Sequence, residues 1–171
     1  MVRKSYDEPV CTYLDEKYCA DGETDIKDEI KKLLDHEYFA VLSTQGKKQP
    51  YASIICFSAS HDFKNIVFAT PRQTRKFSLL NKSDRVALLI DNRSAVPPSV
   101  NKISAVTATG KSRILEDKPE LDYWKDILTS KHPYLKSFVN APSTAIILVD
   151  VYRYFFVRRF QEVTEWDPDQ R

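Results

Sequence analysis

The sequence of 171 residues contains only three glycines, Gly22, Gly46 and Gly110. The phosphate loops G-x-G-x-x-G and G-x-x-x-x-G-K-[ST] both need glycines close together, because their main chain approaches the phosphates closely. These three glycines are too far apart to form either loop. A phosphate-bearing ligand would therefore have to be held mainly by side-chain cations.

Cysteine is also scarce and lacks the spacing of metal ligands. Cys11, Cys19 and Cys56 form no Cys-x-x-Cys pair and have no histidine at ligand spacing, so no metal site is expected. Cys56 lies in the apolar run 53–57, where we expect a buried thiol that acts as a small apolar side chain. Cys11 and Cys19 flank a stretch without periodicity, so residues 1–23 are predicted to form an N-terminal arm before a single domain at 24–171.

Long apolar runs and a strong net charge are absent as well. Twenty-six basic and 24 acidic residues leave a formal charge of +2, which gives no general attraction to nucleic acid. No run approaches the ~20 apolar residues of a membrane span, and the start lacks the apolar core of a signal peptide. With a mean hydropathy of −0.44, we expect a cytoplasmic globular protein without membrane or nucleic-acid partners.

Apolar spacing predicts two longer helices. Ile26, Ile30, Leu33 and Leu34 lie on one face of a helix from about 25 to 36, with Thr24 as its expected cap. A second apolar stripe is formed by Leu121, Trp124, Ile127 and Leu128.

The remaining periodicity is that of strands. Extended patterns cover residues 38–44, 50–57, 65–70, 85–90, 103–115 with a break near Gly110, 145–151 and 154–163. Regular alternation of strand and helix is absent, so a mainly β (α+β) fold whose sheet closes into a barrel is favoured over a doubly wound sheet.

Positive charge is concentrated in one short segment. Residues 72–85 carry five basic side chains and one acid: Arg72, Arg75, Lys76, Lys82 and Arg85, against Asp84. Thr74 is placed to cap a short helix with Arg75 and Lys76 in its first turn, an arrangement that favours a dianion. The alternative is an ordinary solvated basic turn.

The order of strand, Thr70, Arg75-Lys76, helix and then residues 85–88 resembles the phosphate-binding segment of the pyridoxamine 5'-phosphate oxidase-like, FMN-binding split-barrel proteins. A looser similarity extends from about Asp25 to Trp166. The resemblance implies an FMN-binding split β-barrel with peripheral helices, acting as a homodimer with the flavin in the subunit cleft. It also implies flavin redox chemistry on a small-molecule substrate.

In that family the strand before the basic turn meets the flavin ring with main-chain groups, which here implicates residues 52–57. The cofactor-binding residues that the resemblance implies are Ser53, Ile54, Ala69, Thr70, Arg75, Lys76 and Asn92. The alternative for Ser53 and Ile54 is that their strand is simply part of the core. The alternative for Asn92 is that it caps a loop.

The chain departs from the true oxidases of that family in two places. Their C-terminal Arg-x-His pattern is replaced by Arg158-Arg159-Phe160-Gln161, and Ala105 stands where a glutamine approaches FMN. Vitamin B6 oxidation is therefore not expected, and no catalytic residue stands out. The alternatives are an F420- or haem-binding split barrel and a non-enzymatic dimer that binds another phosphate ligand.

Aromatic residues are concentrated near the C-terminus. We expect part of the following set to lie at a subunit interface, with core packing as the alternative: Tyr152, Tyr154, Phe155, Phe156, Phe160 and Trp166.

Overall fold

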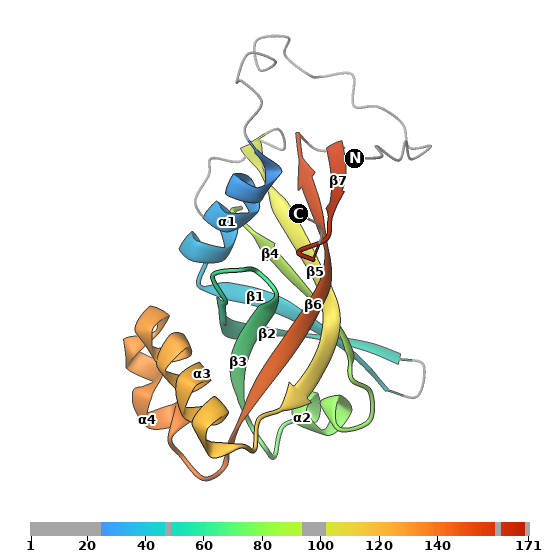
Figure 1. Cartoon of the computed structure of the whole chain (residues 1–171). Helices are drawn as coiled ribbons and strands as arrows, with labels where there is room; N and C mark the ends of the chain where they lie inside the picture. Colours follow the sequence, from blue (N-terminus) through green and yellow to red (C-terminus); the bar gives the residue numbers. More distant parts are fainter. Residues whose placement is uncertain (1–24, 47–48, 94–101, 160–161, 170–171) are drawn as a thin grey trace.

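The computed structural model describes residues 25–46, 49–93, 102–159 and 162–169. In these ranges, six antiparallel strands close into a barrel in the order β3-β2-β1-β4-β5-β6, and β7 adds to the free edge of β6 (Figure 1). The strands are β1 (Phe39–Gly46), β2 (Gln49–Ala59), β3 (Asn65–Pro71), β4 (Arg85–Asp91), β5 (Ala105–Ile114), β6 (Thr144–Arg158) and β7 (Glu162–Trp166). The predicted mainly β split barrel is confirmed, whereas the predicted arm at 1–23 lies outside the described residues.

Strand β6 closes the barrel. Its first half pairs with β3, its middle and second half pair with β5, and its end pairs with β7. The sequence predicted two separate strands here, which is wrong. Thr109 lies opposite Arg153 while Gly110 lies opposite Val151, so Tyr152 is the extra residue of a bulge. The bulge interrupts the alternation of side chains without ending the strand.

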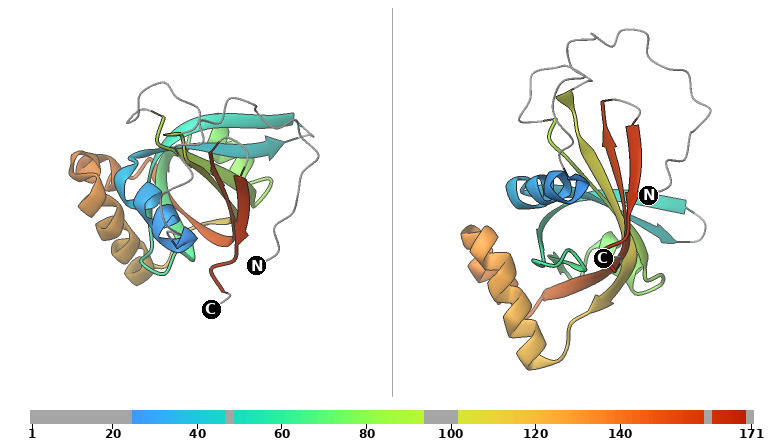
Figure 2. Two further views of the ribbon diagram at one scale, coloured as in Figure 1. Left: turned by 90° about the horizontal axis from the view of Figure 1, so that it is seen from above. Right: turned by 45° about the horizontal axis from the view of Figure 1, so that its top comes forward.

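Two helices cover the barrel interior near its opposite ends (Figures 1 and 2). Helix α1 (Ile26–His36) confirms the predicted helix and buries Ile30, Leu33 and Leu34. Its described cap is Asp25, whose side chain accepts a hydrogen bond from the Lys27 main chain, while the expected cap Thr24 lies outside the described residues. Helix α2 (Arg75–Leu80) is the predicted short helix of the basic segment.

A second apolar layer lies outside the barrel, where α3 (Lys118–Lys131), a 3-10 turn η3 (Pro133–Leu135) and α4 (Lys136–Val139) follow β5. Trp124 and Leu128 of α3 pack against Val67 and Ile146 of the neighbouring strands. None of the helices in the described ranges is long and apolar enough to cross a membrane.

The C-terminal aromatic residues contribute more to the core than we expected. Tyr154 and Phe156 are fully buried in the barrel, and the ring of Trp166 stacks on that of Tyr154. Tyr152 stays half exposed at the bulge. The larger exposed apolar surface lies elsewhere, on the outer face of β1, β2 and β4, where Phe39 and Ile54 are 58% and 69% exposed.

We predict that Gly110→Ala destabilises the protein. An added Cβ would collide with the main-chain carbonyl of Asp150, which cannot move without disturbing the β5–β6 ladder. Overpacking of this kind costs about 1–3 kcal/mol, or a loss of several degrees in Tm by calorimetry. The matched control is Gly46→Ala, whose Cβ would meet only the flexible side chain of Leu79. Equal Tm values for the two variants would contradict this account.

Candidate functional site

The barrel is split between β2 and β3. Strand β2 pairs with β1 from Gln49 to Cys56, but it pairs with β3 only at residues 57–59. Between Gln49 and Cys56 the second edge of β2 therefore has no strand neighbour among the described residues. Such an edge offers main-chain donors and acceptors to another partner.

The basic turn after β3 is organised by two threonines. Thr74 caps α2 as predicted, because its hydroxyl accepts the Phe77 N–H at 3.3 Å. The same hydroxyl donates to the carbonyl of Pro71 at 2.9 Å, and the buried Thr70 hydroxyl lies 3.1 Å from it. These bonds fix the direction in which the following residues leave the turn.

Arg75 and Lys76 lie between this turn and the split. Lys76 Nζ donates to the carbonyl oxygen of Ile54 at 3.1 Å, so the cation reaches the free edge of β2. Burial lowers the pKa of Lys76. The Arg75 guanidinium lies 4.9 Å from the centre of the Tyr51 ring. No carboxylate in the described part of the chain forms an ion pair with either cation, so both can serve an anionic ligand.

Two hydroxyls in the described ranges, one on β2 and one on β6, are buried and unsatisfied. Ser53 Oγ and Thr144 Oγ1 are buried without a hydrogen-bond partner among the described residues. Buried polar atoms are usually paired, so each hydroxyl is a candidate to bind a ligand. Ser53 is next to Ile54 in the sequence, and its side chain points inward because its register partner Leu42 is fully buried. Thr144 lies opposite Pro71 in the β3–β6 ladder, on the outer face that also carries Ala69 and Ile146. Sequence reasoning missed Thr144, because this long-range pairing carries no local signal.

Ala69 and Asn92, the two other residues that the resemblance implied, have side chains engaged in other contacts. The Ala69 side chain packs against the outer apolar cluster beneath α3, so only its main chain is available to a ligand. Asn92 Oδ1 accepts the Ser104 N–H at 2.9 Å, which is the loop-capping role left open by the sequence. We name the group formed by Ile54, Thr70, Arg75 and Lys76 the cradle.

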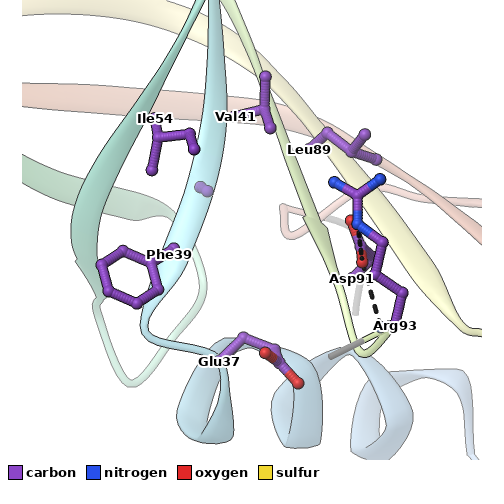
Figure 3. Close-up of a pocket in the computed structure, with 8 residues that line it drawn as sticks. Glu37, Phe39, Val41, Ile54, Leu89, Asp91 and Arg93 are labelled. Atoms are coloured by element: carbon purple, nitrogen blue, oxygen red, sulfur yellow. Dashed lines mark hydrogen bonds and ion pairs between the residues drawn. The ribbon is translucent and has the colours of Figure 1, made fainter. Parts of the chain in front are cut away.

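A cavity of about 310 Å³ lies on the outer barrel face beside the cradle (Figure 3). Its lining residues are Glu37, Phe39, Ala40, Val41, Ile54, Leu89, Asp91 and Arg93. Figure 3 shows the apolar side chains along β1, β2 and β4, with the charged ones at the end nearest α1. Ile54 belongs to both sites: its carbonyl binds Lys76, and its side chain forms part of the cavity wall.

At the charged end of the cavity, Asp91 forms an ion pair with a cation, and Glu37 forms none with the described residues. Arg93 Nε lies 3.0 Å from Asp91 Oδ1, and the Arg93 N–H donates to the same oxygen. The Glu37 carboxylate has no hydrogen bond or ion pair in the described structure, while its main-chain N–H donates to the Leu33 carbonyl at the end of α1. Burial and then the charge of Asp91 raise its pKa, while Lys131 and His36 act in the opposite direction.

Comparison with known proteins gives a consistent result. Residues 26–158 match the sequence profile of the family described as "Pyridoxamine 5'-phosphate oxidase". No curated protein sequence matches the chain.

Several solved structures share the fold at low identity. A heme binding protein from Mycobacterium smegmatis is 15% identical with a TM-score of 0.73, covering 82% of this chain and 57% of its own. General Stress Protein 26 from Bacillus anthracis is 16% identical with a TM-score of 0.63, covering 84% and 99% respectively. A FAD-binding protein from Mesorhizobium loti is 14% identical with a TM-score of 0.61, covering 75% and 91%.

A hydrogen-bonded chain at the end of α3 was not anticipated from the sequence. His132 is fully buried and its Nε2 donates to the Phe57 carbonyl at 2.8 Å, which leaves Nδ1 to accept from the Tyr134 hydroxyl at 2.9 Å. Cys56 Sγ lies 3.8 Å from that hydroxyl. Cys56 is less buried than predicted. It is the register partner of Phe39 on the outer face and stays partly exposed.

The buried imidazole predicts a pH dependence of stability. Burial lowers the pKa of His132 below its usual value near 6.5, so below about pH 6.5 the unfolded chain binds a proton that the folded protein resists. The free energy of unfolding should fall as the pH decreases through this window. In His132→Gln, which can still donate to Phe57, this contribution should disappear, and Tm measured from pH 7 downward should decline less than in the unmodified protein.

The control for this experiment is Tyr134→Phe. It keeps the imidazole buried, and burial is the largest cause of the lowered pKa of His132, so it should keep the original decline. A His132→Gln profile parallel to that of the unmodified protein would rule out His132 as the source.

Proposed function

Because the chain belongs to the pyridoxamine 5'-phosphate oxidase family, we propose that it is an FMN-binding oxidoreductase whose flavin phosphate is held in the cradle. The observation that carries the proposal is the pair of uncompensated cations, Arg75 and Lys76, beside the free edge of β2. Arg75 offers a planar two-pronged contact to a phosphate, and Lys76 offers a point charge.

A neighbouring group of β2 fits the same ligand. The Ser53 hydroxyl, next to Ile54 on β2, has no partner among the described residues and would be available to a phosphate or ribityl oxygen. Main-chain groups on the unpaired edge of β2 could meet the polar edge of a flat ring, apart from the Ile54 carbonyl, which accepts from Lys76. Bound FMN would supply hydride chemistry, while the protein would position the ring and exclude water.

Haem is the main rival, because one structural neighbour is a heme binding protein. Haem iron is held by His, Cys, Met or Tyr side chains; none of these residue types lines the cavity, and beside the cradle Tyr51 lies under the Arg75 guanidinium. The cradle, by contrast, is suited to a phosphate. The deazaflavin F420 also carries a phosphate, and the absorbance spectrum of the purified protein distinguishes these cofactors.

The proposed substrate is not a vitamin B6 phosphate. Arg158 and Arg159 stand near the position of the missing Arg-x-His pattern, but both pair with Glu162, and Arg158 also pairs with Glu29. Ala105, in place of the expected glutamine, is paired in the sheet with Asp91 and offers no polar side chain.

A homodimer is part of the proposal. Ile54, Val41 and Leu89 are register partners on adjacent strands, so their side chains form one outward row across β2, β1 and β4. Exposed apolar rows of this kind are typical of protein interfaces. This face, rather than the C-terminal aromatic set, is the proposed contact, and it would place the cavity between two subunits.

The cradle proposal predicts that Arg75→Ala and Lys76→Ala each weaken FMN binding by about 1.5–3 kcal/mol, the range for hydrogen bonds to charged groups. Titration of the apo-protein by flavin fluorescence quenching measures this. Lys82→Ala is the matched control, because it removes an exposed cation of the same segment that lies past the end of α2. Unchanged dissociation constants in both cradle variants would remove the cradle from the proposal.

The dimer proposal predicts a mass of about twice 19.8 kDa in sedimentation at micromolar concentration. Leu89→Asp places a charge in the centre of the outward row and should shift the equilibrium to monomers. Tyr123→Asp, at an exposed aromatic on α3, should remain dimeric. A monomer in the unmodified protein, or a dimer lost equally in both variants, would contradict the proposed interface.

A further inference from the structure

We propose that the cavity of Figure 3 binds a small organic cation, a protonated primary amine on a flat apolar body, with its ammonium group at Glu37. The proposal deepens the proposed function, and rests on it, in one respect: this amine would define the substrate class of the flavoprotein. The residues of this chain on which the binding is argued are those that line the cavity.

The walls suit a flat apolar body. Phe39, Val41, Ile54 and Leu89 form the sides, and they come from three adjacent strands whose outward side chains are in register. A volume of about 310 Å³ is at the lower end of small-molecule sites, which span about 300–1,000 Å³, so the ligand is the size of a single ring with a short substituent.

The charge at the end of the cavity nearest α1 selects the sign of the ligand. Arg93 contacts Asp91 through both its guanidinium and its main-chain N–H. That pair is neutral overall, and Glu37 then contributes a negative charge that no group lining the cavity balances. Lys131 and His36 also act on Glu37, but neither lines the cavity, and the Lys131 ammonium donates to the Leu34 carbonyl and lies over the Phe57 ring.

The same arrangement disfavours an anionic ligand. A phosphate or carboxylate in the cavity would face Glu37 at close range, and its only cation, Arg93, would have to leave Asp91. Like charges brought together in a partly desolvated site are strongly unfavourable. Anions are therefore directed to the cradle and cations to the cavity, with Ile54 between them.

The experiment is calorimetric titration of the full-length protein, both apo and FMN-loaded, with three probes of one shape: benzylamine, benzyl alcohol and benzoate. At about pH 7.5, benzylamine should bind at least about tenfold more tightly than the other two. Glu37→Gln should lose about tenfold in benzylamine affinity and leave benzyl alcohol unchanged. Glu116→Gln, at an exposed carboxylate after β5, is the matched control and should behave as the unmodified protein.

A second variant changes the affinity in the opposite direction. Arg93→Gln removes the partner of Asp91, so the cavity gains a second uncompensated carboxylate and benzylamine should bind several-fold more tightly. Because the Arg93 side chain is largely exposed, the variant should fold even if Glu37→Gln does not. Lowering the pH toward the raised pKa of Glu37 should weaken benzylamine binding in the unmodified protein and not in Glu37→Gln.

Three results would overturn the inference: benzoate binding as tightly as benzylamine, no effect of Glu37→Gln and Arg93→Gln on benzylamine, or no binding of any probe at about 10 mM. FMN binding is measured separately on the same samples. Loss of FMN binding with intact Glu37-dependent amine binding would refute the proposed function alone, and the reverse result would refute the amine site alone.

Discussion

The pairing of β3 with β6 is the constraint on which the rest of the structure depends. All seven residues of β3 pair with β6, whereas only three residues of β2 pair with β3. Because β3 pairs with β6 along its whole length, it pairs with β2 only at residues 57–59, and residues 49–56 of β2 keep one edge unpaired among the described strands. The same pairing brings Thr144 opposite Pro71, at the start of the basic turn. The split, the turn and the position of α2 are consequences of one ladder.

The two sites beside the split use different parts of the same strand. In a β-strand the main-chain groups point sideways within the sheet, while the side chains point to its two faces. Ile54 accordingly presents its carbonyl to Lys76 and its side chain to the cavity. Ser53, one residue earlier, points inward, since its partner Leu42 is fully buried. A single extended segment thus offers a polar edge, a buried hydroxyl and an apolar wall to ligands on different sides.

The sequence predicted the elements well where the pattern is local. Helix α1, the cap Thr74 and most strand positions follow from apolar spacing and capping chemistry, and the grouping of Thr70, Arg75 and Lys76 follows from their order along the chain. The continuity of β6 could not be predicted, because the bulge at Tyr152 breaks the alternation from which strands are recognised.

The parts of the site that depend on long-range packing were also missed. Asp91 and Arg93 flank the predicted residue Asn92, but their position in one cavity with Glu37 depends on how α1 lies on the sheet. Thr144 and the chain from His132 to Cys56 likewise join segments that are distant in sequence. Single-sequence patterns carry no information on such pairs.

The β3–β6 ladder also affects the order of folding. The β1–β2 and β4–β5 hairpin partners are close in the sequence, but Pro71 and Thr144 are separated by α2, β4, β5 and α3. Contacts of high sequence separation form late, because the entropy of closing a long loop must be lost before the contact is gained. Before that step β3 lacks most of its partners and the inner faces of both hairpins are open to water. We therefore expect barrel closure to limit the rate of refolding, and the strand edges that are unpaired until then are of the kind that promotes aggregation.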